Sequence, residues 1–313
     1  MSTVKLLATT CALAAAAFTD AVPTLQAQPL RMYSEFRRVG PNNQIIRQDS
    51  TGDPREIISP AVLRGMHVSY RIVVATPPGM NYWMYIGANP EELIESTIYR
   101  EHTVAGVPAS LEQVKLPVNG KLPEAGSPQA PRQADTYWVD LFIPRTTPAR
   151  RIRFEAQLNF DNRWVIYPLE VRVMEGELAE AQPEDATLAA PRPATNTADP
   201  ARAAFQRVLC PPPSNAKPAQ KPASPAPAAV NMPSQDAFLL RNAQQDLALV
   251  RSAEARRGHD FVIKGLIEAL ADSDAPKPAD AKSFCAPLRK PYNPEIILRA
   301  RDFLIRAATP PND

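Results

Sequence analysis

The chain has 313 residues, and its 35 lysines and arginines against 33 aspartates and glutamates leave a formal net charge of +2 at pH 7. So balanced a charge creates no overall field that would attract a nucleic acid or an anionic membrane, and we expect neither as a partner. The 35 prolines far outnumber the 11 glycines, and this excess predicts ordered parts separated by proline-rich connections.

The first 27 residues have the pattern of a secretory signal peptide. Lys5 precedes an apolar run from Leu6 to Phe18, and Thr24 to Ala27 supplies a small residue at a cleavage point. The run is too short to cross a bilayer, and no later segment reaches about 18 consecutive apolar residues, so no transmembrane segment is expected after cleavage. We therefore expect an exported protein of the periplasm, the cell surface or the extracellular space.

Export decides how the three cysteines are interpreted. Cys11 lies inside the apolar run of the leader, without the leucine typical of a lipidation site before it, and the sequence leaves its lipidation open. Cys210 and Cys285 then remain as an even pair in a compartment that permits disulfides. We predict a bridge between them, and two separate thiols are the alternative.

Residues 30–175 carry the period-two pattern of β-strands. Apolar residues alternate from Met66 to Val74, and Pro77-Pro78-Gly79 then supplies the turn before a new segment at Tyr82. Four more segments have strand character: residues 32–38, 94–102, 114–118 and 137–143. With the pair described next, this makes about seven or eight short antiparallel strands, which predicts a two-sheet β-sandwich.

The clearest strand pair lies at the end of this region. Arg151 to Leu158 alternates apolar and polar residues as a half-buried antiparallel strand does, and Trp164 to Met174 is its expected partner. Asp161-Asn162 is the expected hairpin turn. Pro168 has no N–H for a sheet ladder and marks an edge position or a bulge.

Two stretches carry a resemblance to a known family. Arg55 to Gly65 leads into the strand that starts near His67, and Tyr137 to Pro144 is followed by the proline-containing Thr147 to Arg150. This succession of strand, proline and new strand resembles the immunoglobulin-like or fibronectin type III-like modules of secreted bacterial proteins. The resemblance covers about half of the mature chain and implies a sandwich with a binding, spacer or accessory role.

Residues 176–233 are rich in proline and alanine and contain too few apolar residues to form a core, so they are expected to be a linker. A short helix at residues 201–210 is the expected exception. The linker divides the mature chain into a sandwich domain at 30–175 and a helical region at 234–313.

Helical spacing begins at Ser234 or Asp236, either of which can cap a first helix. Asp246 and Arg251 fall on the side of this helix that we expect to be solvated. Gly258 interrupts the helix, and a second one follows it.

The last helix has the strongest start signal, Asn293-Pro294-Glu295, and is expected to end near Ala308. Three helices of this size form only a small core. Docking of this bundle on the sandwich and docking on another chain are both open.

Few residues of the sequence suggest catalysis or the binding of a metal or cofactor. The three histidines, His67, His102 and His259, lack metal-ligand spacing, and neither an HExxH motif nor a glycine-rich phosphate loop occurs, so we expect no metal and no cofactor. The acids considered as catalytic candidates are Asp135, Asp140, Glu155 and Asp161. We expect them on solvated strand faces, without a catalytic role.

Aromatic residues are the better candidates for a binding surface. Trp83 and Tyr85 share one side of their strand, and Trp138 and Phe142 share one side of another. Exposed rings would suit stacking on sugars or anchoring a protein partner, and the alternative is that the linker, the helices or the other sheet cover them.

Three functions therefore remain open. The first is a non-catalytic binding or scaffolding protein with a protein partner in the envelope or outside the cell. The second is a carbohydrate-binding module, and the third is a polysaccharide hydrolase or an accessory subunit of a secreted enzyme.

Overall fold

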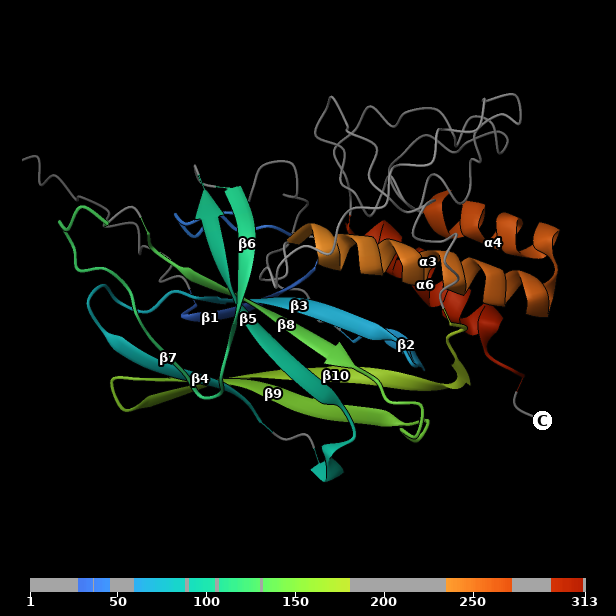
Figure 1. Ribbon diagram of the computed structural model, residues 1–313, viewed down its shortest axis with the longest axis horizontal. Helices are drawn as coiled ribbons and strands as arrows, with labels where there is room; N and C mark the ends of the chain where they lie inside the picture. Colours follow the sequence, from blue (N-terminus) through green and yellow to red (C-terminus); the bar gives the residue numbers. More distant parts are fainter. Residues whose placement is uncertain are drawn as a thin grey trace, which may run out of the picture.

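The computed structural model describes residues 28–35, 37–45, 59–87, 90–104, 107–129, 132–180, 235–271 and 294–311. The leader with Cys11, the 201–210 segment, Cys210 and Cys285 lie outside the described residues, so signal cleavage, the short helix and the disulfide stay predictions. The described part forms two five-stranded sheets packed face to face, with three α-helices beside one end of them (Figure 1).

The two sheets have five strands each within this part of the chain. The first has the order β1 (Leu30–Ser34), β3 (His67–Val74), β8 (Asp135–Phe142), β5 (Glu95–Val104) and β6 (Val107–Val114). The second has the order β2 (Ala61–Arg64), β10 (Arg163–Glu177), β9 (Arg151–Phe160), β4 (Asn81–Gly87) and β7 (Val118–Lys121). All neighbours pair antiparallel except β2 and β10.

Alternating side chains from both sheets fill the space between them. In β9 the even positions from Ile152 to Leu158 are buried, whereas Arg151 and Arg153 are exposed. Tyr137, Val139 and Leu141 of β8 belong to the same buried cluster from the opposite sheet. These two packed sheets confirm the predicted β-sandwich. The prediction succeeded because a strand with one apolar face needs a second sheet to cover that face.

The β9–β10 hairpin has the predicted form. Asp161 and Asn162 both adopt left-handed backbone angles, with φ of 47° and 56°, as a two-residue hairpin turn of type I′ requires. Pro168 pairs with Glu155 of β9, while β2 joins the other side of β10 only from Arg172 onward. Pro168 therefore occupies an edge position, where its missing N–H disrupts no ladder.

Three details differ from the prediction. The described strands number ten rather than seven or eight, and β2, β6 and β7 were not among the predicted segments. Residues 114–118 are not a strand: Val114 ends β6, Val118 begins β7, and the connection between them contains the Leu116-Pro117 peptide bond. The first three residues of β2 are all buried and show no alternation, so periodicity could not reveal this strand.

The helices are α3 (Gln235–Arg257), α4 (His259–Ala271) and α6 (Pro294–Ala308). Gly258, with φ of +82°, separates the first two, and the last begins at Pro294, as expected. Leu249 of α3 and Leu304 of α6 belong to the same buried cluster as Leu63 of β2. The helices therefore dock on the sandwich, and none of the described helices is long and apolar enough to cross a membrane.

The prediction that Asp246 lies on the solvated side of the first helix is wrong. Asp246 is fully buried rather than solvated, because Arg301 of α6 donates to it from Nε at 2.6 Å and from Nη2 at 3.1 Å. Arg301 also pairs with Glu35, just after β1, and Asn242 of α3 donates to the same Glu35 carboxylate. A buried ionic cluster thus joins α3, α6 and the first sheet.

Candidate binding surface

The outer face of the first sheet is covered by a helix. Trp138 of β8 is fully buried, with Phe238 of α3 at a ring-centroid distance of 5.8 Å and the Arg71 guanidinium carbon 4.4 Å from its ring centroid. Arg71 in turn donates to Glu101 at 3.0 Å. Trp138 therefore takes no part in an exposed surface, and the alternative in which the helices cover the ring applies to it.

Phe142, at the end of the same strand, is half-buried and lies 4.8 Å from the His67 ring, centroid to centroid. Trp83 and Tyr85 belong to β4 of the other sheet. The fold thus places the four predicted aromatic residues on two opposite outer faces, and only Trp83 and Tyr85 lie together.

The outer face of the second sheet carries the exposed rings. Trp83 is 56% exposed, and β10 adds Trp164 at 54% and Ile166 at 52%. Tyr85 is half-buried, with its ring edge-on to Trp164 at a centroid distance of 6.2 Å. Trp164 and Ile166 were missed as site residues, although alternation along the predicted strand from Trp164 to Met174 already places both on one face.

Strand register arranges these side chains in two rows. Trp83 lies opposite Asn159 of β9, and Asn159 lies opposite Trp164. In the next row Tyr85, Gln157 and Ile166 align in the same way. We call these six residues the aromatic face: Trp83, Tyr85, Gln157, Asn159, Trp164 and Ile166. The two tryptophans are two strands apart, about 10 Å between backbones, with an amide side chain between them.

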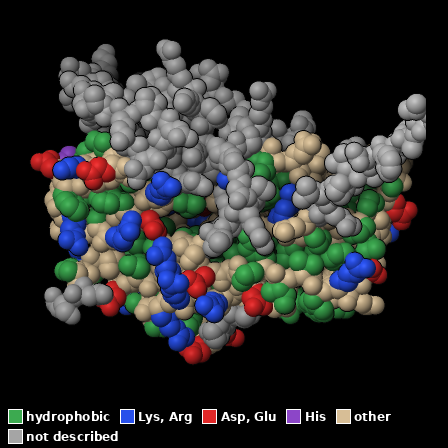
Figure 2. Space-filling model, turned by 180° about the vertical axis from the view of Figure 1, so that it is seen from behind, with side chains coloured by type: hydrophobic (Ala, Val, Ile, Leu, Met, Phe, Trp, Pro, Cys, Tyr) green, Lys and Arg blue, Asp and Glu red, His purple; other side chains and the backbone are tan. Residues whose placement is uncertain are grey.

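Charged groups border the aromatic face but do not enter it. Glu155, one row further, accepts a hydrogen bond from Gln157 Nε2 at 2.9 Å and so orients the amide. Beyond it Glu170 pairs with Arg151 at 3.0 Å and with Arg153 at 3.4 Å. Figure 2 shows the same mixture on the back of the molecule, where hydrophobic side chains reach the surface between charged clusters. Because no charged side chain lies at the centre of the aromatic face, this surface suits an uncharged ligand.

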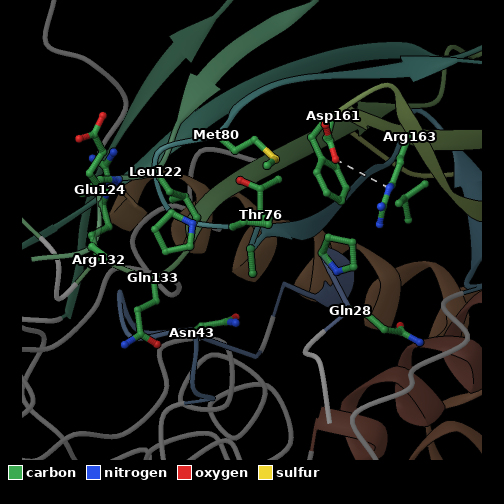
Figure 3. A pocket seen from close by; sticks show the side chains of 18 of the residues that line it. Gln28, Asn43, Thr76, Met80, Leu122, Glu124, Arg132, Gln133, Asp161 and Arg163 are labelled. Carbon is green, nitrogen blue, oxygen red and sulfur yellow. Dashed lines mark ion pairs between the residues drawn. The ribbon is translucent and has the colours of Figure 1, made fainter. Parts of the chain in front are cut away.

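A pocket of about 880 Å³ adjoins the aromatic face at the end of the sandwich. The β3–β4 turn, the residues just before β1, the segment after β7 and the β9–β10 turn all contribute to its wall (Figure 3). Trp164 belongs to both the pocket and the aromatic face.

The four acids considered as catalytic candidates have separate environments. Asp140 is buried and receives hydrogen bonds from Arg241 Nη1 and Nη2, both at 2.7 Å, while buried Asp135 accepts the Tyr82 hydroxyl. The expectation that these two are solvated is wrong, because helix α3 covers Asp140 and because Asp135 bonds to the buried Tyr82 of the other sheet. Glu155 binds Gln157, and Asp161 lies 3.9 Å from Arg163.

The histidines each face an acid: His67 faces Asp140 at 3.1 Å, His102 faces Glu112 at 2.9 Å, and His259 faces Glu254 at 3.5 Å. In the described ranges no group of three or more potential metal ligands comes together.

Comparison with known proteins does not assign the chain to a family. No family model and no curated protein match the chain. Among solved structures it is similar to a family 123 glycoside hydrolase from Clostridium perfringens, with 10% identity and a TM-score of 0.33 over 48% of this chain and 27% of that one. It is also similar to the C-terminal domain of the Streptococcus agalactiae AgI/II polypeptide BspA, with 9% identity and a TM-score of 0.24 over 46% and 49%.

A third similar structure is the class 5 fimbriae chaperone CfaA, with 11% identity and a TM-score of 0.19 over 39% of this chain and 56% of that one. The chain thus spans about a quarter to somewhat over half of the length of these three proteins. The similarity is too low to assign a function, and the β-sandwich assignment rests on the sheets themselves.

Proposed function

We propose that this is an exported, non-catalytic binding protein of the cell envelope or extracellular space, and that it binds a polysaccharide through the aromatic face. The observation that carries the proposal is the pair of tryptophans, Trp83 and Trp164, each more than half exposed on either side of Asn159. The signal-like pattern of residues 1–27 supports export.

Sugar rings match both components of the aromatic face. Their C–H faces are apolar enough to stack on indole rings, and their hydroxyl groups both donate to and accept from amides such as Asn159 and Gln157. Contiguous exposed apolar patches are uncommon on soluble domains unless they serve binding. The two-strand spacing of the tryptophans is comparable to the length of a disaccharide unit, which suits an extended chain that stacks alternate sugars.

Tryptophan substitution tests this proposal. The mature full-length chain and its Trp83→Ala and Trp164→Ala variants would be incubated with insoluble cellulose, chitin and peptidoglycan, and the bound fraction measured. Each variant is expected to bind the preferred polymer about tenfold more weakly, because a stacked ring contributes on the order of 1–2 kcal/mol.

Phe261→Ala is the matched control, since Phe261 is 54% exposed but lies on α4. It should bind like the unmodified chain, and circular dichroism should show that all three variants fold. Failure of the unmodified chain to bind any of the polymers, or full binding by the Trp83→Ala/Trp164→Ala double variant, would contradict the proposal.

A protein partner is the second candidate, favoured by Ile166. This aliphatic side chain is 52% exposed within the aromatic face, and a protein interface uses such a group whereas sugar stacking does not need it. The unmodified chain should then crosslink to one envelope protein without binding the polymers, and Ile166→Ala should weaken the crosslinking. The hydrolase alternative would instead require polymer turnover that Asp140→Asn or Glu155→Gln abolishes.

A further inference from the structure

The pocket at the end of the sandwich contains polar groups that the fold leaves without partners. Thr76, just after β3, is 4% exposed, and its Oγ1 has no hydrogen-bond partner. The amide oxygen of Asn43, which also lines the pocket, is buried and equally unpartnered. Buried polar atoms are nearly always hydrogen-bonded in folded proteins, so these two atoms at one pocket have the capacity to bond to a ligand or a water that enters it.

Thr76 occupies a central place among the lining side chains. Figure 3 shows it between Arg132 and Gln133 on one side and the ion-paired Asp161 and Arg163 on the other. Its hydroxyl is covered in the free protein, and a change of χ1 rotamer moves the hydroxyl to the position that the methyl group or the Cβ hydrogen occupies. A ligand hydroxyl can therefore bond to Oγ1 without movement of the backbone.

The charges around the pocket favour an uncharged ligand. The two lining cations, Arg132 and Arg163, are each already near a carboxylate: Arg132 lies 3.4 Å from Asp135, and Arg163 lies 3.9 Å from Asp161. Glu124 pairs with Lys121 at 3.1 Å. Neither sign of charge is in excess, so an ionic ligand gains little by entering.

Most of the remaining wall is apolar, with Pro77, Pro78, Met80 and Leu122 among its residues, and Gln28 and Gln133 add two amides. A volume of about 880 Å³ lies in the range of small-ligand sites. An apolar wall with a few unpartnered hydrogen-bonding groups suits a compact ring with several hydroxyls, which presents a C–H face and donors on one molecule.

We propose that this pocket is a second binding site, which takes the terminal sugar of the chain lying on the aromatic face. Trp164, shared by the two surfaces, makes them continuous. The identity of the ligand rests on the proposed function, whereas the pocket, its unpartnered atoms and its neutrality do not. Recognition of a chain end would make the protein bind short oligosaccharides as well as polymers.

The Thr76→Val variant tests the proposal, because it should weaken ligand binding without lowering the melting temperature, whereas a misfolded variant would lose both. The variant keeps the side-chain shape and removes the unpartnered hydroxyl, so the free protein should melt at the same or a higher temperature. Its affinity for the preferred probe among cellotetraose, chitotetraose and xylotetraose should fall about three- to tenfold, the effect of one lost hydrogen bond. Isothermal titration calorimetry and thermal unfolding measure the two quantities.

Thr147→Val is the matched control. Thr147 is 1% exposed and donates through Oγ1 to the Leu93 carbonyl at 2.9 Å. Because its hydroxyl has a partner and lies outside the pocket, this variant should melt at a lower temperature and bind the same tetrasaccharide with unchanged affinity.

The outcomes separate the pocket from the aromatic face. Loss of binding in Trp83→Ala with full binding in Thr76→Val overturns the pocket proposal and leaves the aromatic face standing. Weakened binding in Thr76→Val with full binding in Trp83→Ala supports the pocket and contradicts the role of the face. If the unmodified chain binds none of the three tetrasaccharides, the pocket proposal is wrong, and polymer binding then decides the proposed function separately.

Discussion

Asp140 is the residue at which burial and hydrogen bonding compete most clearly. Burial on its own would raise the pKa of this carboxyl group. Hydrogen bonds from His67 and Arg241, together with the charge of Arg241, outweigh burial and hold its pKa below the ordinary 3.8. The side chain is therefore ionised at neutral pH, and its contacts with Arg241 hold α3 against the first sheet.

The stability conferred by Asp140 should depend on pH. Because the pKa is lower in the folded than in the unfolded chain, the carboxylate stabilises the fold above the unfolded value and loses this effect as pH falls through the folded value. Asp140→Asn should lower the free energy of unfolding by about 3 kcal/mol at neutral pH. In urea unfolding, the difference in unfolding free energy between Asp140→Asn and the unmodified chain should shrink below pH 3.8.

The control is Asp161→Asn at an exposed position, which should change the free energy of unfolding by less than about 0.5 kcal/mol. A difference for Asp140→Asn that does not change with pH would contradict the assignment.

At the scale of elements, the contact between edge strand β7 and its neighbour β4 depends on one glycine. Gly120 pairs with Tyr82, and a Cβ at Gly120 would lie 2.2 Å from Tyr82 Cζ. The Tyr82 ring is 1% exposed, and its hydroxyl bonds to Asp135 and, at 2.7 Å, to the Tyr137 hydroxyl. Burial and these neighbours raise the pKa of Tyr82, so the phenol stays protonated and the ring stays in place.

Gly120→Ala should therefore destabilise the fold by about 1–3 kcal/mol, since the added methyl group overpacks a ring that is held by hydrogen bonds. Thermal unfolding monitored by circular dichroism measures the effect. The neighbouring Asn119→Ala, on the exposed side of the same strand, should stay within about 0.5 kcal/mol of the unmodified chain. Equal stability of the two variants would show that the Tyr82 ring moves freely.

At the scale of the whole molecule, the buried cluster around Arg301 ties together three distant parts of the chain. Arg301 of α6 pairs with Asp246 of α3 and with Glu35 beside β1. Burial raises the pKa of both carboxyl groups, although Arg301 opposes the rise. Two acids and one shared guanidinium make a contact that is specific in geometry and sensitive to the loss of the cation.

Removal of that cation should affect helices and sheets together. Arg301→Met is expected to lower the free energy of unfolding by about 3–5 kcal/mol, because two buried acids lose their partner. Far-ultraviolet circular dichroism and tryptophan fluorescence should report one shared transition, since both parts contribute to one core. Arg306→Ala, exposed on the same helix, should change stability by less than about 0.5 kcal/mol. Separate transitions in the Arg301→Met variant would mean that the helices are held independently.

Local signals account for the features that could be predicted from the chain alone. Alternation along Arg151 to Leu158, the Asp161-Asn162 turn and the Asn293-Pro294 helix start each depend on a few neighbouring residues, so their outcome is visible without knowing the rest of the fold. Strand β2 lacked such a signal, because it is buried on both faces and shows no alternation.

The sequence by itself determined a β-sandwich followed by helices, and it pointed to Trp83 and Tyr85 as candidate surface residues. Only the tertiary structure decided which rings stay exposed, because Trp83 and Trp138 have the same strand pattern and differ only in that α3 crosses over Trp138. It likewise decided that Asp246 is buried, since its partner Arg301 lies 55 residues away. Burial depends on contacts between segments far apart in the chain, and no local pattern contains them.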